Sequence, residues 1–307
     1  MSDCQIVQPD AVIDGKYRIE HYVARGGVGT LFKAIDIRTT QPCALKITHE
    51  ATTNRRRMTI REASLATRAT HANLAKVVDH GELPDGRAYV ASEWIDGVTF
   101  GAAWRSSARS IRQSLEALES ISRALGALHE AGVIHRDVKP DNIIIPFDSS
   151  CLAYEWSAAK LVDFGVAAEH STAALLSTYD SRGRTSGTPN YMAPEQLTGR
   201  RQFPETDLYA IGVVIYECIW GATPFANVER LGFRHQPWDA PVAAGPFVMS
   251  RISKDVTFPD TPEVAAELVR LVRSLLDRRI DQRPKSGVAV ADAIRQLIDA
   301  STLTGTA

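Results

Sequence analysis

The chain has 307 residues, 44% of them apolar, and a formal net charge of −1 at pH 7. This composition suits a globular protein with one or two hydrophobic cores and excludes a disordered chain. A near-neutral charge argues against a nucleic acid or a membrane surface as the main partner. The four cysteines have no CxxC spacing, so we expect free thiols in a reducing compartment and neither a zinc site nor a disulfide framework.

The start of the chain lacks the basic and apolar regions of a signal peptide. The longest apolar run, near Ile211 to Trp220, is too short to span a bilayer. We therefore expect a cytoplasmic protein.

Residues 17–47 predict strands separated by Gly-rich and polar turns, and the alternation breaks at Gly26, Gly27 and Gly29. A Gly-rich hairpin lets backbone N–H groups approach a phosphate without Cβ clashes. A tight structural turn explains the same glycines about equally well, so this signal by itself is weak.

The middle of the chain predicts three further elements in order. Residues 55–69 suit a helix, and two short strands joined by the Asp85-Gly86 turn form a hairpin. An amphipathic helix that ends at Gly132 follows, because apolar residues recur at intervals of three and four. Those residues are Ile111, Leu115, Leu118, Ile121, Leu125 and Leu128.

The segment HRDVKPDN, residues 135–142, places three chemically useful side chains at fixed offsets. Asp137 can orient a hydroxyl or accept its proton, Lys139 can neutralise a transferring phosphate, and Asn142 can hold a metal ion. Phosphoryl transfer needs these parts and little covalent chemistry from the protein.

Beyond this segment lie a short apolar strand, a polar stretch at 146–159, and the triplet Asp163-Phe164-Gly165. GTPNYMAPEQL follows at 187–197, and residues 206–221 predict a helix that is apolar on most sides and hence central. Another helix should start at Thr261-Pro262-Glu263 and run through Val264 to Leu275.

HRDVKPDN, DFG and GTPNYMAPEQL occur in the order used by eukaryotic-type (Hanks-type) serine/threonine protein kinases. The chain resembles this family over about residues 17–298, and its sequence pattern is most similar to that of the bacterial members. The resemblance implies an α+β, bilobal protein-kinase fold with ATP in the cleft. A small β-rich N-lobe with one main helix would span 17–95 and a larger, mainly α-helical C-lobe 96–298. Residues 1–16 would be an N-terminal extension and 299–307 a short tail.

The resemblance also implies which residues bind ATP. The family pattern G-x-G-x-x-G-x-V here has Ala24 for its first glycine, and a one-carbon side chain is tolerated there if φ is negative. Lys46 would contact the α and β phosphates and pair with Glu62. Ser92 would be a small gatekeeper that implies an enlarged back pocket. The full implied set is Val23, Ala24, Gly26, Gly27, Gly29, Leu31, Ala44, Lys46, Glu93, Ile95, Asn142 and Asp163.

The implied reaction moves the γ-phosphoryl group of Mg-ATP to a Ser or Thr hydroxyl. The implied catalytic residues are Asp137, Lys139, Lys46, Glu62 and Thr188, and the implied ligands of Mg²⁺ or Mn²⁺ are Asn142 and Asp163. Thr188 would face Asp137 and Lys139, which favours Ser and Thr over Tyr as acceptors. Protein substrates are the implied partners, with the enzyme a monomer or a transient homodimer during autophosphorylation.

Three supporting interactions are implied as well. Glu195 should pair with Arg283, and Asp207 should brace the HRD backbone, although a first-turn Asp also favours a helix dipole. Arg136 can pair with a phosphate on the activation segment, whose candidate acceptors are Ser171, Thr172, Ser177, Thr178, Ser181, Thr185 and Ser186. The run at 55–57 is either a solvated arginine cluster or a second receiver of that phosphate.

Residues 146–159 make the spacing between HRD and DFG longer than is usual in the family. We place the excess on the surface, where it is either a neutral insertion or a docking feature. Two rival functions are weaker. A pseudokinase scaffold would need a broken Lys46, Asp137 or Asp163, and a small-molecule kinase of similar fold would lack GTPNYMAPEQL.

Overall fold

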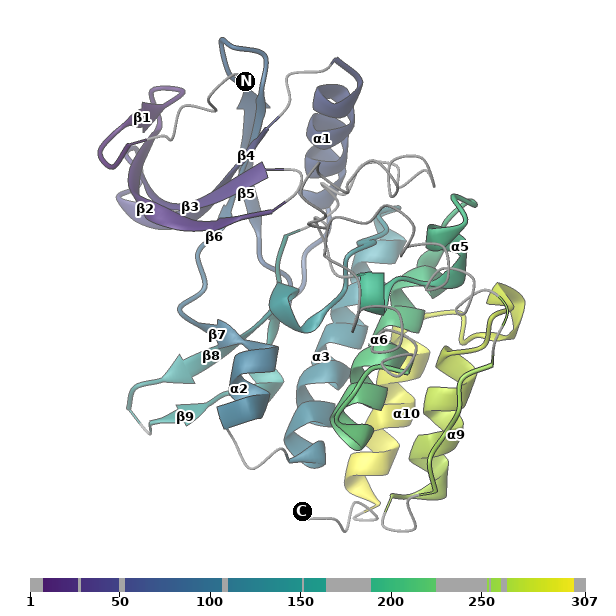
Figure 1. The fold of residues 1–307 in the computed structure, drawn as a ribbon. Coiled ribbons are helices and arrows are strands. Elements are labelled where there is room, and N and C mark those ends of the chain that lie inside the picture. The colour runs from purple at the N-terminus through teal and green to yellow at the C-terminus, as the bar shows by residue number, and fades with distance from the viewer. Residues whose placement is uncertain are drawn as a thin grey trace, which may run out of the picture.

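The computed structural model describes residues 8–26, 29–49, 53–106, 110–150, 152–163, 189–224, 253, 255–260 and 264–300. These residues form a strongly curved sheet with one helix beside it and, below, a mainly helical lobe (Figure 1). The predicted bilobal α+β architecture is therefore confirmed.

The N-lobe sheet has six antiparallel strands in the order β1-β2-β3-β4-β6-β5. The strands are β1 (Val12–Ile13), β2 (Tyr17–Arg25), β3 (Gly29–Asp36), β4 (Gln41–Thr48), β5 (Val77–Glu82) and β6 (Ala88–Glu93). Alternate residues of β3 and β4 are buried, which is the period-2 pattern of a sheet with one covered face. β1 begins upstream of Tyr17, so the sheet extends beyond the boundary predicted for the lobe.

Helix α1 (Thr53–Ala66) contacts β5 and β6, close to the helix predicted at 55–69. The predicted hairpin at Asp85-Gly86 is also confirmed, with Gly86 at φ +84° between β5 and β6. Tyr17 donates a hydrogen bond of 2.8 Å to Asp79 of β5. This bond joins the second strand of the sheet order to the last, so the sheet curls back on itself.

The C-lobe consists of helices with a small antiparallel sheet at one edge, beside α2 (Figure 1). The helices are α2 (Phe100–Ser106), α3 (Ile111–Glu130), α5 (Pro194–Leu197), α6 (Pro204–Trp220), α9 (Ala266–Leu275) and α10 (Gly287–Asp299). The strands are β7 (Gly97–Thr99), β8 (Ile143–Asp148), β9 (Ala153–Tyr154) and β10 (Lys160–Leu161). Short 3₁₀ helices lie at η1 (Pro140–Asn142), η2 (Trp156–Ala158), η3 (Pro189–Tyr191) and η4 (Ile280–Gln282).

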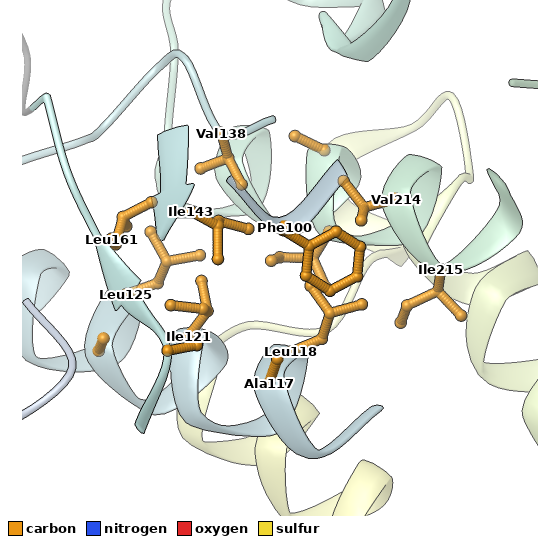
Figure 2. Packing of buried hydrophobic residues seen from close by; sticks show 14 of the residues in the cluster. Phe100, Ala117, Leu118, Ile121, Leu125, Val138, Ile143, Leu161, Val214 and Ile215 are labelled. Carbon is orange, nitrogen blue, oxygen red and sulfur yellow. The ribbon is translucent and has the colours of Figure 1, made fainter. Parts of the chain in front are cut away.

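Helix α6 lies at the centre of this lobe, in contact with α3 and α9 (Figure 1). Its residues from Thr206 to Tyr216 are all buried, as the all-round apolar sequence predicted. Figure 2 shows Leu118 of α3 directed toward the ring of Phe100 of α2, with Ile215 of α6 to the side and Ile121 of α3 farther from the ring. All four side chains are at most 1% exposed, so α3 joins α2 and α6 through one core.

Helices α3 and α10 approach each other very closely at two glycines. A Cβ on Gly287 would lie 2.1 Å from the carbonyl oxygen of Ser122 and 2.7 Å from the backbone nitrogen of Gly126. A Cβ on Gly126 would meet the side chain of Val288 at 3.0 Å. The first contact is with backbone, which cannot rotate away.

We therefore expect Gly287→Ala to lower the free energy of unfolding by about 1–3 kcal/mol, because α10 must shift away from α3. Gly126→Ala should cost less, since the Val288 side chain can turn. Denaturant unfolding of the three proteins checks this order, and an equal or larger loss for Gly126→Ala contradicts it.

Two expectations need correction. The last predicted helix begins at Ala266, so Val264 precedes it, and residues 261–263 lie outside the described part. The stretch 146–159 is not simply a surface insertion, because its Trp156 is 5% exposed and packs edge-on against Phe100 at 5.8 Å. A large aromatic side chain removes more apolar surface from water when it fills a gap beside α3 than when it lies in an exposed loop.

The described cysteines, Cys43 and Cys218, are buried free thiols, whereas Cys4 and Cys151 lie outside the described residues. Every helix among the described residues is too short or too polar to cross a lipid bilayer.

Candidate active site

The loop between α3 and β8 brings Asp137, Lys139 and Asn142 together. The Lys139 ammonium donates to Asp137 Oδ2 at 2.7 Å, and the Asn142 amide donates to the same oxygen at 2.9 Å. The Asn142 amide also donates to the Asp137 carbonyl at 2.7 Å, which closes the loop around one carboxylate. The sequence placed these three side chains on one segment, and the structure gathers them at one oxygen.

A buried carboxylate, Asp207 of α6, holds this loop from below. It accepts hydrogen bonds from the backbone N–H groups of His135 at 2.8 Å and Arg136 at 2.7 Å, so the predicted brace is confirmed. His129 Nε2 lies 2.7 Å from the same carboxylate. Burial opposes the charge on Asp207, but the hydrogen bond and charge of His129 hold its pKa below the usual value. Sequence analysis missed His129, although it falls on the buried face of the helix that enters HRD.

Arg136 is held in a backbone conformation that few residues adopt. Its φ is +68°, and its carbonyl accepts a hydrogen bond of 2.8 Å from Gln196 of α5. The amide of Gln196 thus ties the end of GTPNYMAPEQL to the catalytic loop. This second tie was also missed, because its acceptor is a backbone carbonyl of a segment that is distant in sequence.

A cavity of about 280 Å³ lies between the lobes. Seven predicted ATP-binding residues line it: Val23, Leu31, Ala44, Lys46, Glu93, Ile95 and Asp163. Its wall continues past Ser92 to Ala63 of α1, Val77 and Val90, in agreement with the back pocket expected behind a small gatekeeper. Most of the remaining wall is apolar, as in pockets that enclose a flat ring.

The described residues of the Gly-rich hairpin, which do not include 27 and 28, accommodate Ala24 in place of a glycine. Ala24 is paired with Leu31 and lies outside the positive-φ residues, so its methyl group is tolerated. The backbone N–H of Gly26 donates to the Gly29 carbonyl at 2.9 Å. A Cβ on Gly29 would lie 2.5 Å from the Ile47 carbonyl oxygen, so this glycine is needed for the close approach of β4.

The residues predicted to hold a divalent cation suit one chemically. Asp163 and Asn142 offer oxygen ligands, which Mg²⁺ prefers, and the backbone N–H of Val162 donates to the Asn142 carbonyl at 2.9 Å. Burial opposes ionisation of Asp163, yet the nearby Lys46 ammonium lowers its pKa, so the carboxylate is charged. An ammonium already lies against this carboxylate, since Lys46 Nζ is 2.5 Å from Asp163 Oδ1.

The family model of the protein kinase domain matches residues 17–296. The chain belongs to the protein kinase family. It is 31% identical over 302 residues to the probable serine/threonine-protein kinase pknA2 of Bifidobacterium longum, covering 94% of this chain and 36% of that protein. It is 31% identical over 290 residues to the serine/threonine-protein kinase PknA of Mycobacterium tuberculosis, covering 92% of this chain and 61% of that one. The chain therefore spans about a third to three fifths of these relatives.

The kinase domain also resembles solved structures. It matches the PknI kinase domain of Mycobacterium tuberculosis with a TM-score of 0.66 and 21% identity, over 95% of this chain and 99% of that one. The likeness establishes the fold. The roles of individual residues depend on the geometry of this chain.

The predicted ion pair between Lys46 and Glu62 is wrong for this conformation of the kinase domain. Lys46 pairs with Asp163, and Glu62 pairs with Arg136. Lys46 thus meets a different carboxylate from the one expected, and Arg136 meets a carboxylate where a phosphate was expected. Spacing along the chain cannot decide this, because three separate segments supply the two carboxylates and Arg136.

Burial raises the pKa of Glu62 to about 7, from an ordinary value of 4.5, although the charge of Arg136 acts against this rise. The unfolded chain therefore releases the Glu62 proton near pH 4.5, whereas the folded kinase domain keeps it to about pH 7. The free energy of unfolding should therefore fall as the pH rises through this interval, and the contribution of Glu62 to it should be constant at higher pH.

We expect Glu62→Gln to remove this pH dependence of the unfolding free energy. Between pH 5 and 8 the variant should therefore lose less stability than the wild type, by an amount on the order of 1–3 kcal/mol. Denaturant unfolding across that range checks the difference. Glu82→Gln, at an exposed acid paired with Arg56, should follow the wild-type profile. Parallel profiles for wild type and Glu62→Gln would contradict the prediction.

The predicted pair of Glu195 and Arg283 is confirmed. The Arg283 guanidinium donates to both Glu195 oxygens, at 2.7 and 2.9 Å, and to the carbonyls of Asp277 and Glu205. The Arg283 side chain is fully buried, and its guanidinium lies over the Tyr209 ring at 4.8 Å. The pair fixes the segment after the activation loop to α6 and η4.

Several predicted residues lie outside the described part of the chain: Gly27, Phe164, Gly165, Thr188, Ser171, Thr172, Ser177, Thr178, Ser181, Thr185 and Ser186, with the side chain of Arg55.

Proposed function

We propose that this kinase domain transfers the γ-phosphoryl group of ATP to Ser and Thr hydroxyls of proteins. The observation that carries the proposal is the cluster of Asp137, Lys139 and Asn142, held within 2.7–2.9 Å on one braced loop. Neither a scaffold nor a small-molecule kinase explains both this cluster and GTPNYMAPEQL. The domain would span 17–298, with the lobes meeting between Ile95 and Asp96.

In the proposed reaction Asp137 orients the acceptor hydroxyl and takes its proton, while Lys139 offsets charge on the moving phosphoryl group. Lys46 would exchange the Asp163 carboxylate for phosphate oxygens of the nucleotide. Asn142 and Asp163 would hold Mg²⁺ or Mn²⁺, which when bound neutralises charge on the β and γ phosphates. Thr188 would contact Asp137 and Lys139 and so favour Ser and Thr acceptors.

Adenine would bind at the strand that joins the lobes. Backbone groups of Glu93 and Ile95 are the proposed partners of the ring edge, and both residues line the cavity. Val23, Leu31 and Ala44 would cover the ring faces, in keeping with their apolar side chains. The Gly-rich hairpin, including Ala24, Gly26, Gly27 and Gly29, would approach the phosphates.

Regulation would act through Arg136. Its guanidinium pairs with Glu62 in this conformation. A phosphate carries more charge than a carboxylate and is a strong acceptor for arginine. Phosphorylation within 171–186 would therefore draw Arg136 away and free Glu62 to pair with Lys46, the arrangement that the family resemblance implies.

Protein substrates in the cytoplasm are the proposed partners, and autophosphorylation would need at most a transient homodimer. The decisive experiment incubates the purified protein with Mg-ATP and a generic acceptor protein, beside Lys46→Met, and reads phosphate by intact and peptide mass spectrometry. We expect phosphate on Ser or Thr with the wild type only. If the wild type binds nucleotide but phosphorylates neither itself nor the acceptor protein, the result would instead support a scaffold.

A further inference from the structure

A single lysine connects the strand between the lobes to the strand that leads into the metal-binding carboxylate. The Lys160 ammonium lies 2.8 Å from Glu93 Oε1 and 3.0 Å from Glu93 Oε2. Glu93 is the last residue of β6 and lines the nucleotide cavity. Its side chain is 37% exposed and that of Lys160 is 23% exposed, so the pair sits partly out of water.

The backbone that carries Lys160 is fixed from both sides. Lys160 pairs with Ile144 of β8 in an antiparallel ladder. On the other side, Leu161 donates to the Asn73 carbonyl at 2.8 Å, and its own carbonyl accepts from Ala75 at 2.9 Å. The Asn73 amide donates to the Ala159 carbonyl at 2.7 Å. Because this backbone is held on both sides, the Lys160 ammonium can keep a partner carboxylate in place.

Glu93 receives a second set of contacts that orients it. Its backbone N–H donates to the Lys76 carbonyl at 2.8 Å, and its carboxylate accepts from the Lys76 N–H at 3.2 Å. Its backbone N–H is therefore already used by Lys76. Lys160 supplies the cation that holds the carboxylate in this arrangement.

The same short strand ends at the other end of the nucleotide site. Two residues after Lys160, the backbone N–H of Val162 donates to the Asn142 carbonyl at 2.9 Å, and the Val162 carbonyl lies 3.0 Å from His135 Nε2. Asp163 comes next. The Glu93–Lys160 pair thus links the strand at the adenine end of the proposed site to the strand that leads to its phosphate end.

We infer that Lys160 is a positioning residue for nucleotide binding, acting through Glu93 rather than by contact with ATP. The inference rests on the proposed function, because it takes Glu93 as an adenine-binding residue. Lys160 affects how tightly the nucleotide is held and leaves the chemical step at Asp137 unchanged. Loss of the ammonium should therefore change the KM for ATP more than kcat.

The test compares wild type with Lys160→Met for binding of the non-hydrolysable analogue AMP-PNP with Mg²⁺, by calorimetry, and for kcat and KM with a generic acceptor protein. We expect Kd and KM for the nucleotide to rise about two- to fivefold, with kcat unchanged. Lys160→Arg should restore most of the affinity. In Glu93→Gln the further change Lys160→Met should have no additional effect.

Lys76→Met is the matched control, because the exposed Lys76 contacts Glu93 through its backbone and should leave Kd unchanged. Wild-type affinity in Lys160→Met, or an equal effect with and without Glu93→Gln, overturns the inference. A wild type that binds AMP-PNP but transfers no phosphate overturns the proposed function, and the binding comparison still decides the role of Lys160. A wild type that binds no AMP-PNP overturns both.

Discussion

Asp137→Asn should lower kcat for phosphoryl transfer by about 10²–10⁴-fold, the range supplied by a positioned acid or base. An asparagine at this position keeps an oxygen that can accept from Lys139 and Asn142, which now bond the carboxylate at 2.7 and 2.9 Å. It cannot take the proton of the acceptor hydroxyl. The loop should therefore keep its shape, and the loss should appear in kcat with little change in the KM for ATP.

Steady-state assays with a generic acceptor protein, beside thermal unfolding, measure both parts of this prediction. Asp141→Asn is the matched control, since it makes the same change at an exposed residue of the same loop and should keep kcat within about twofold. Near wild-type turnover in Asp137→Asn would remove Asp137 from the chemical step. A large fall in stability would instead show that the carboxylate is needed for folding.

Arg283→Met should lower the free energy of unfolding by about 3–5 kcal/mol. The substitution leaves the carboxylate of Glu195, which is 4% exposed, without the cation that now binds both of its oxygens. It also removes donors from the carbonyls of Asp277 and Glu205. An isolated buried charge is expensive because no water replaces the lost partner.

Denaturant unfolding gives the loss directly. Lys285→Met, two residues along the chain, breaks an ion pair with Glu205 in which the lysine is 59% exposed, and should cost at most about 1 kcal/mol. Adding Glu195→Gln to Arg283→Met should recover part of the stability, because the stranded charge is then removed. Equal losses for Arg283→Met and Lys285→Met would show that the buried pair contributes no more than a surface pair.

The catalytic cluster could be predicted because its members are close in sequence. Asp137, Lys139 and Asn142 lie within six residues of one another, so the bend of a single loop is enough to bring them to one oxygen. The central position of α6 could be predicted too, since a helix that is apolar on most sides has no polar face to expose to solvent and must be buried. The resemblance to the kinase family then supplied partners that are distant in sequence, among them Glu195 and Arg283.

The charge pairing of Lys46, Glu62, Asp163 and Arg136 followed no such rule. Lys46 comes from β4, Glu62 from α1, Asp163 from the segment just after β10 and Arg136 from the catalytic loop. Either carboxylate is a reasonable partner for either cation. The choice depends on the position of α1 relative to the lower lobe, and many weak contacts set that position. For the same reason the stretch around Trp156 was expected at the surface, although a gap beside Phe100 accepts its ring.

The sequence by itself was enough to predict the kinase family and the order of the lobes, because the motifs that carry the resemblance are each made of residues close together along the chain. Only the tertiary structure decided which charges neutralise each other, that His129 and Gln196 join Asp207 in bracing the loop, and that Lys160 pairs with Glu93. Ion pairs and hydrogen bonds between distant segments depend on distances of a few tenths of an ångström, and chain order does not encode those distances.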